Sequence, residues 1–185
     1  MAFHHLALVT RDAPATHAFY THAMGFELVK TVVAATPGGG WAKHFFYETG
    51  QGGLMAFWEL HDETIPEGYS AAISTGMGLP EWVNHVAFGA SGAEDLDRRR
   101  ERLVAQGYDV LEIDHGWCRS IYTRDPNGTL VEFCTTTRAF DDEDRRRALE
   151  VLRSPNPALE APGPKPKIYE ASVEPVHVRV ARGEA

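Results

Sequence analysis

The residues whose types suggest chemistry gather between His115 and Glu132, a stretch that also contains Tyr122. Within it the segment 125–128, Asp-Pro-Asn-Gly, has a turn composition, because Pro fixes one φ angle and Asn and Gly tolerate positive φ. The pattern predicts a strand, a turn and a second strand, on which Leu130, Glu132 and Cys134 share one face. A carboxylate on a half-buried strand is costly unless it is paired or bound to a metal. Glu132 therefore predicts further metal ligands elsewhere in the chain, and an exposed strand glutamate is the alternative.

Two runs of elements follow the same order along the chain. Strands are expected at 3–9, 26–33, 41–47 and 54–60, with a helix between the first two that begins at Asp12 and stops at Gly25. The second run has strands at 83–88, 108–113, 118–123 and 129–135, with a helix that starts near Ser91 and closes before Gly107. We therefore expect an α+β protein made of two tandem βαβββ modules, related by internal duplication.

The duplication gives His5 and His85 equivalent positions on the first strand of each module. Two histidines and one carboxylate from separate strands form the facial triad of non-haem Fe(II) oxygenases, which leaves metal positions open for substrate and dioxygen. Mn(II) fits the same ligands, and Zn(II) accepts them too. The sequence thus predicts a metal site of His5, His85 and Glu132, whereas either histidine alone would more simply be an ordinary strand residue.

The composition limits the classes of partner. The chain has 185 residues, 43% of them hydrophobic, and a formal charge of −8, which argues against a nucleic-acid or anionic-membrane partner because both need a positive face. Two cysteines are too few for a disulfide scaffold and fit a reducing compartment. No window is long and apolar enough for a membrane span, and the N-terminus lacks a signal-peptide pattern, so we expect a cytoplasmic protein.

These features resemble the vicinal oxygen chelate superfamily, which includes glyoxalase I, methylmalonyl-CoA epimerase, bleomycin- and fosfomycin-resistance proteins and type I extradiol dioxygenases. The resemblance covers residues 3–135 and implies that the modules form a half-open mixed β-barrel. The stretch from His115 to Glu132 is similar to the ring-cleaving extradiol signature: a His, five residues, Ile-Tyr, two residues, Asp-Pro, a Gly and then the Glu. The resemblance implies that Glu132, His5 and His85 bind the metal, while His115 and Tyr122 are catalytic groups that hydrogen-bond the substrate oxygens. It further implies Fe(II), a catechol-like aromatic diol as substrate, and a homodimer.

The first module distinguishes the subfamilies. Glyoxalase I and the epimerase have a fourth ligand at the position equivalent to Glu132, and setting Tyr122 against Tyr47 puts Phe57 there. Three ligands favour the dioxygenase, whereas a register shifted by two would make Glu59 a fourth ligand and favour a Ni(II)- or Zn(II)-dependent isomerase or lyase.

A second departure concerns a histidine that extradiol enzymes carry just before the last strand of the first module. This chain has Gly-Gly there, and His44 or His61 is a candidate substitute. A non-catalytic drug-binding protein, in which aromatic side chains hold a ligand without metal, is a third reading.

The expected domain limits are 1–60 for the first module, 61–81 for the connection, 82–138 for the second module and 139–185 for a C-terminal segment. In that last segment residues 141–152 predict a helix, a proline-rich stretch follows, and 168–180 predict a terminal strand or arm. The arm would cover either its own domain or a partner subunit.

Overall fold

The computed structural model describes residues 3–50 and 52–184, so the ends of the chain and one residue of the turn before the strand at 54 lie outside it. The first module contains strand β1 (His5–Thr10), helix α1 (Ala13–Ala18), the π-helical turn η1 (Phe19–Ala23) and strands β2 (Glu27–Ala35), β3 (Trp41–Glu48) and β4 (Leu54–His61). Asp12 caps α1 by accepting a hydrogen bond from the amide of Ala15, as the sequence predicts. The strands form one sheet, sheet A, in the order β1-β4-β3-β2.

The second module repeats this plan. After the short 3₁₀ turn η2 (Thr75–Met77) come β5 (His85–Gly89), α2 (Ala93–Ala105), β6 (Val110–Asp114), β7 (Cys118–Arg124) and β8 (Leu130–Thr136). Sheet B has the order β5-β8-β7-β6-β9, in which the last strand comes from the C-terminal segment. In each module the first strand pairs in parallel with the last, with His5 opposite Leu54 and His85 opposite Leu130. The α+β class and the two βαβββ modules are confirmed.

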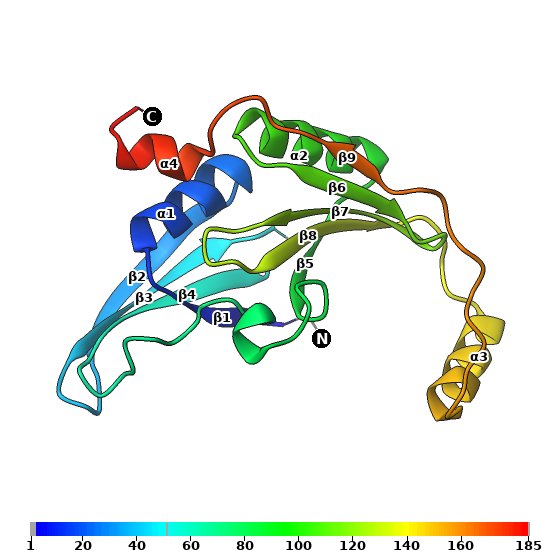
Figure 1. Ribbon diagram of the computed structural model, residues 1–185, viewed down its shortest axis with the longest axis horizontal. Coiled ribbons are helices and arrows are strands. Elements are labelled where there is room, and N and C mark those ends of the chain that lie inside the picture. Colours follow the sequence, from blue (N-terminus) through cyan, green and yellow to red (C-terminus); the bar gives the residue numbers. More distant parts are fainter. Residues whose placement is uncertain (1–2, 51, 185) are drawn as a thin grey trace.

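One hydrophobic core lies between the helix-bearing faces of the two sheets (Figure 1). Phe19 contacts Tyr108 edge to face, and Phe26 contacts Phe133 in the same way, so side chains of the first module pack directly on the second. Burial of these aromatic rings, together with the aliphatic side chains of the same core, holds the modules together. The other face of each sheet is turned away from this core, and we call these the open faces of sheets A and B.

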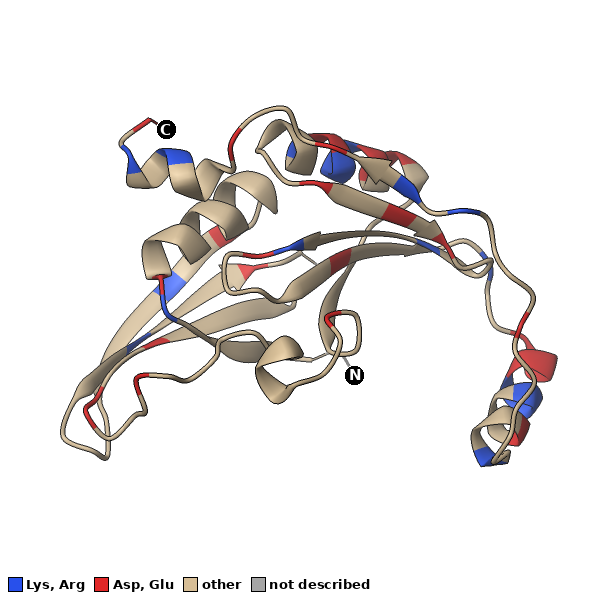
Figure 2. Cartoon of the chain, viewed as in Figure 1, with Lys and Arg blue, Asp and Glu red and all other residues tan. Residues whose placement is uncertain are grey.

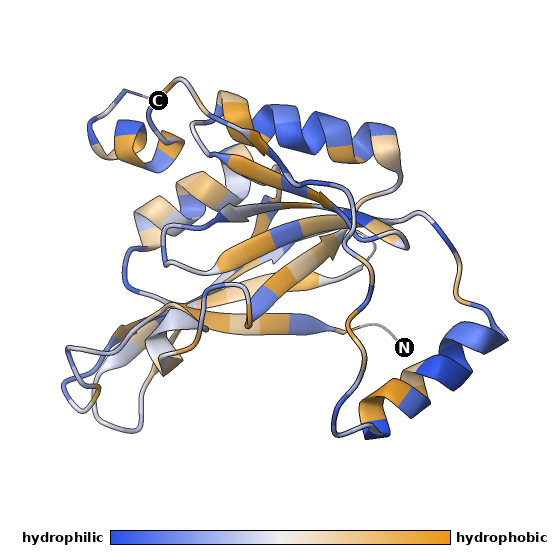
Figure 3. Cartoon of the chain, turned by 45° about the vertical axis from the view of Figure 1, so that its right-hand side comes forward, coloured by the Kyte–Doolittle hydropathy of each residue, from blue (hydrophilic) through white to orange (hydrophobic). Residues whose placement is uncertain are grey.

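The C-terminal segment has three elements. Helix α3 (Asp142–Arg153) begins with a capping box between Asp141 and Asp144 and extends away from the sheets (Figures 1 and 3). Strand β9 (Lys167–Tyr169) then pairs antiparallel with β6, and helix α4 (Val176–Ala181) packs on α1. The predicted helix at 141–152 is confirmed. The terminal strand is shorter than expected, and the short helix α4 is an element that the sequence did not predict. A 2.6 Å hydrogen bond between the Tyr108 hydroxyl and Nδ1 of His177, together with the buried Val176, holds α4 on the core.

Charged side chains are intermixed along the helices. Arginines are interspersed with Asp and Glu on α2 and α3 (Figure 2). Several of these form ion pairs one turn apart, such as Arg99 with Asp95 and Arg146 with Glu143. Within the described residues, no helix combines the length and the apolar composition that a membrane span requires.

Candidate metal and substrate site

The open face of sheet B brings His85 and Glu132 together. Glu132 is directly opposite Ala87 on β5 and opposite Tyr122 on β7, and since side chains alternate along a strand, His85 shares their face. The Nε2 atom of His85 lies 3.1 Å from Oε2 of Glu132, whose residue is 6% exposed. A carboxylate this deeply buried needs a positive partner, which an imidazolium or a bound metal ion supplies.

The orientation of His85 fits a metal ligand. Its Nδ1 lies 3.2 Å from the backbone carbonyl of Trp82, and only a protonated Nδ1 can donate to that oxygen. In the neutral ring the lone pair is then on Nε2, which faces the Glu132 carboxylate. Two acceptors at this distance repel each other unless a cation lies between them, and a histidine held by a backbone carbonyl through its other nitrogen is the usual arrangement at metal centres. The donor set therefore fits a divalent metal.

Tyr122 and His115 form a hydrogen-bonded pair beside these residues. Nε2 of His115 lies 3.0 Å from the Tyr122 hydroxyl, and the rings of Tyr122 and His85 are 6.2 Å apart. Burial of the phenol, together with the neighbouring Glu132 carboxylate, raises the pKa of Tyr122 to about 12. Tyr122 therefore stays protonated at neutral pH and can donate a hydrogen bond. Sheet B thus gathers four of the five predicted site residues, because β5, β7 and β8 are neighbours in it.

His5 lies apart from this group, on the open face of sheet A. Its Nδ1 is 2.8 Å from Nδ1 of His4, and its ring is 6.2 Å from that of His44. Over residues 3–50 and 52–184, no three His, Cys, Asp or Glu side chains lie close enough together to hold a metal ion. A single chain therefore provides two of the three predicted ligands at one place and the third at another.

The strand register also revises the comparison of the two modules. Because His5 is opposite Leu54 and His85 is opposite Leu130, the position equivalent to Glu132 is Ala56. The prediction that Phe57 occupies this position was wrong by one residue, and Phe57 is instead fully buried in the core. The error arose from aligning tyrosines across strands of unequal length.

The two alternative side chains at the end of β4 face away from His5. Glu59 is on the same face as Phe57, where it forms a 2.8 Å ion pair with Lys43 and contacts His61 at 3.1 Å. The ring of His61 stacks on Trp41 at 3.8 Å. Glu59 is therefore not a fourth ligand beside His5, and His61 does not replace the missing histidine.

His44 is different, because it shares the open face of sheet A with His5. It stacks on Trp58 at 3.7 Å and is only 9% exposed, and burial lowers its pKa, with a further contribution from His5. Its Nε2 is buried and makes no hydrogen bond to any described residue. A buried imidazole nitrogen without a partner is uncommon, so His44 carries an unused hydrogen-bonding atom beside a predicted ligand.

A groove of about 910 Å³ runs over the open face of sheet B. Its lining contains three of the predicted site residues, His85, Tyr122 and His115, whereas the buried Glu132 lies behind His85 and is not part of the lining. It also contains Trp82 and Ile168, which the sequence did not single out. Trp82 lies three residues before β5 starts at His85, and Ile168 is on β9, which the tertiary fold brings to the edge of sheet B. A volume of this size is typical of pockets for small organic molecules.

The comparisons with known proteins settle the family. The model of the Glyoxalase/Bleomycin resistance protein/Dioxygenase superfamily matches residues 2–133. The chain belongs to this superfamily. No protein of curated function matches the chain in sequence.

Solved structures share the superfamily fold with this chain. A glyoxylase/bleomycin resistance protein/dioxygenase domain from Frankia sp. EAN1pec is 18% identical with a TM-score of 0.56, over 74% of this chain and 98% of that one. The genomically encoded fosfomycin resistance protein FosX from Listeria monocytogenes is 22% identical with a TM-score of 0.52, over 78% and 98%. A mutant of that FosX, crystallised with Mn(II) and 1S,2S-dihydroxypropylphosphonic acid, is 22% identical with a TM-score of 0.50, over 78% and 97%. At these identities the likeness shows the fold.

Proposed function

We propose that this superfamily member is a metal-dependent dioxygenase of the extradiol ring-cleaving type, which acts on a catechol-like aromatic diol with Fe(II). The observation that carries the proposal is the row of side chains on sheet B: His85 beside a buried Glu132, and next to them the hydrogen-bonded pair of Tyr122 and His115. Ring cleavage of a diol bound to a metal requires metal ligands, a hydrogen-bond donor and an acid or base next to the metal. His85 and Glu132 would be two of the ligands, Tyr122 the donor and His115 the acid or base.

We propose that His5 comes to this site from a second copy of the chain. Strand β2 is exposed along its whole length, and its Val32 lies on the open face of sheet A together with His5. If sheet A of one copy covers sheet B of another, twofold symmetry makes this contact twice, and each site receives His5, His85 and Glu132. The homodimer would thus complete the triad that one chain does not.

Each side chain then has a defined task. Fe(II), when bound, would hold both oxygens of the diol and lower the pKa of its hydroxyl groups. The Tyr122 hydroxyl, which stays protonated, donates a hydrogen bond to a substrate oxygen. His115, whose Nε2 contacts that hydroxyl, takes up or returns a proton. His44 enters the site beside His5, where its Nε2, which makes no hydrogen bond to any described residue, replaces the missing histidine as a partner for the substrate.

The isomerase or lyase reading is less well supported. It relies on a fourth protein ligand from the first module, and the equivalent position holds Ala56 while Glu59 faces the other way. Mn(II), Zn(II) and Ni(II) remain alternatives to Fe(II) for the same donors. The drug-binding reading requires no metal, and it predicts that His85 and Glu132 stay empty. We also retain the proposal of a cytoplasmic location, which rests on the two unpaired cysteines.

Metal analysis of protein purified without oxygen tests the proposal. The native chain and His85→Ala would be measured by mass spectrometry, with His61→Ala as a matched control on the opposite face. We expect about one iron per chain in the native and control proteins, and little in His85→Ala. Oxygen uptake with catechol derivatives would then follow the iron content. Stoichiometric nickel or zinc without oxygen uptake would instead support the isomerase, and no metal in any sample would refute both enzymatic readings.

A further inference from the structure

One wall of the groove is built by residues that the family match does not reach. Ile168 on β9, and Ala171 and Val173 just after it, line the same cavity as Tyr122 and His85. The family model ends at residue 133, so this wall is an addition to the two modules of the superfamily.

The strand pairing places Ile168 in line with the site. Ile168 is opposite Leu111, Leu111 is opposite Tyr122, and Tyr122 is opposite Glu132. Direct partners lie on the same face of a sheet, and neighbouring strands are about 4.8 Å apart. Ile168 therefore stands roughly 10 Å from Tyr122 along a straight row of side chains that starts at the proposed metal ligand. A group that extends from the diol across this row meets Leu111 first and Ile168 next.

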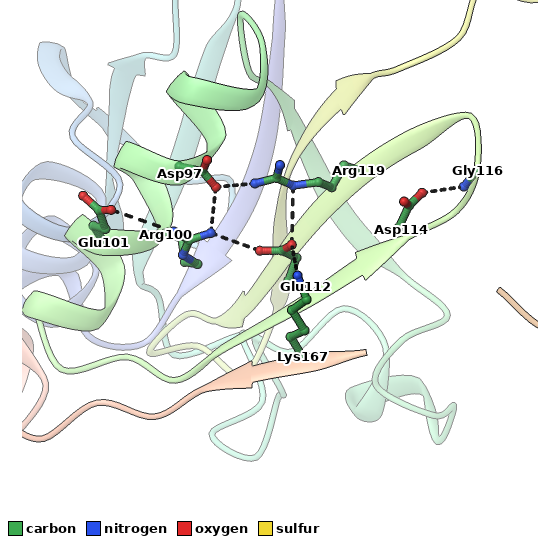
Figure 4. A network of polar contacts seen from close by, with 8 residues as sticks. All are labelled: Asp97, Arg100, Glu101, Glu112, Asp114, Gly116, Arg119 and Lys167. Carbon is green, nitrogen blue, oxygen red and sulfur yellow. Dashed lines mark hydrogen bonds and ion pairs between the residues drawn. The ribbon is translucent and has the colours of Figure 1, made fainter. Parts of the chain in front are cut away.

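Contacts on both sides hold this wall in place. Arg100 of α2 lies over the ring of Tyr169 at 4.5 Å, and the amide of Ala171 donates a 2.8 Å hydrogen bond to Asp109. Lys167 lies 3.8 Å from Glu112, the buried carboxylate at the centre of a charged network (Figure 4). The same Glu112 pairs with Arg100 at 3.1 Å, so β9 is tied to α2 through one buried anion. The wall is thus a supported part of the sheet.

The lining chemistry indicates what the wall contacts. The polar groups that suit a diol are His85, Tyr122 and His115. Apart from the charged residues Glu81, Asp109 and Arg124, much of the remaining lining is apolar: Trp82, Leu111, Ile113, Leu130, Ile168 and Val173. Ile168 is 69% exposed, so a ligand group that covers it would remove apolar surface from water.

We propose that the β9 segment, residues 167–173, is the specificity wall of the site, and that the substrate is a vicinal diol with an apolar substituent about one ring in size, which packs on Leu111 and Ile168. This inference rests on the proposed function for the diol end of the substrate. The wall itself stands on the groove and the strand register.

A pair of ligands that share one chelating end tests it. Catechol and 3-phenylcatechol would be titrated by calorimetry into the iron-loaded native protein under anaerobic conditions, which prevent turnover. The variant Ile168→Thr keeps a β-branched side chain and so preserves the strand, whereas Ile168→Leu is the apolar control. In Ile168→Thr we expect the Kd for 3-phenylcatechol to rise about tenfold, because a methyl-sized change in an apolar pocket has effects of this order. The Kd for catechol should change less than about twofold, and Ile168→Leu should resemble the native protein.

A second titration separates this inference from the proposed function. The apolar dye 8-anilinonaphthalene sulfonate would be bound to metal-free protein, with Leu152→Thr on the exposed face of α3 as the control for dye bound elsewhere. Dye affinity that falls in Ile168→Thr but not in Leu152→Thr supports the wall even if no iron or oxygen uptake is found. The wall is refuted if Ile168→Thr leaves both the dye affinity and the ratio of the two Kd values unchanged, or if it weakens the binding of both catechols equally. The dioxygenase proposal is tested separately, by the metal content.

Discussion

The hydrogen bond from Tyr20 to Asp125 gives the sharpest prediction about the stability of the fold. The Tyr20 hydroxyl donates to Oδ2 of Asp125 at 3.1 Å and so joins η1 of the first module to the β7–β8 turn of the second. Asp125 is 3% exposed, and it also accepts the amides of Thr129 at 2.8 Å and of Asn127 at 2.9 Å. The variant Tyr20→Phe removes only the hydroxyl and leaves the aromatic packing unchanged.

The size of the effect follows from the partners that remain. A hydrogen bond to a charged group contributes about 1.5–3 kcal/mol, and we expect the lower end because Asp125 keeps its backbone donors. A loss of about 1.5 kcal/mol in the free energy of unfolding corresponds to a Tm that is about 3–6 °C lower for a chain of this size.

The pH dependence gives this prediction a sign. Burial raises the pKa of Asp125 above its ordinary value, and the hydrogen bonds, including that from Tyr20, oppose the rise. A carboxyl with a raised folded-state pKa contributes most to stability below its ordinary pKa, and this contribution is lost as the pH rises through the folded value. Tyr20→Phe raises the folded pKa of Asp125 further, so the variant loses more stability at about pH 8 than at about pH 4.

Urea denaturation followed by circular dichroism at both pH values measures this difference. Tyr47→Phe is the control, because it removes a buried hydroxyl that contacts a histidine, His17, at 3.1 Å instead of a carboxylate. We expect the control to lose about 0.5–1.5 kcal/mol at about pH 8. Equal losses for Tyr20→Phe at the two pH values, or no loss at all, would refute the role assigned to Asp125.

Three further predictions concern the C-terminal helix and the site. Burial lowers the pKa of His177 in the folded protein, so the unfolded chain takes up a proton at a higher pH than the folded one does. The Tm of the native protein should therefore fall between about pH 7 and pH 5, and the Tm of His177→Gln should lack this decline. Tyr122→Phe should keep its iron but lower kcat for oxygen uptake about 10²-fold, and an unchanged kcat would exclude Tyr122 as the donor. His44→Phe should likewise lower kcat with little change in metal content, whereas His61→Phe should be nearly neutral; equal effects of the two substitutions would argue against a place for His44 in the site.

Local sequence patterns were sufficient for most of the fold. Alternating apolar residues, the Asp12 cap and the Asp-Pro-Asn-Gly turn act over a few residues, so the modules and the helix at 141–152 follow from them directly. The positions of Glu132, His85, Tyr122 and His115 on one face also follow, because strand period and module order together fix which side chains meet. In the structure these four residues lie together at the open face of sheet B, and their roles toward metal and substrate stay predictions.

Other features depended on contacts that no local pattern records. The position equivalent to Glu132 was misassigned by one residue, since register is set by the pairing of β1 with β4, and a slip of one residue moves a side chain to the opposite face. The short helix α4 arises where Tyr108 and His177 meet across the fold.

The sequence by itself indicated the family and the two modules, because the motif between His115 and Glu132 and the repeated order of elements can be recognised from residue types and spacing. It also singled out the residues whose types suit a metal, whose role stays a prediction. Only the tertiary structure decided that His5 lies apart from His85 and Glu132, that Glu59 and His61 face away from His5 while His44 shares its face, and that β9 adds a wall to the groove. The physical reason is that a sheet has two faces and an edge. Packing between segments far apart in the chain determines on which face a candidate metal-binding side chain lies. The same packing determines which distant strand pairs with the edge of the sheet.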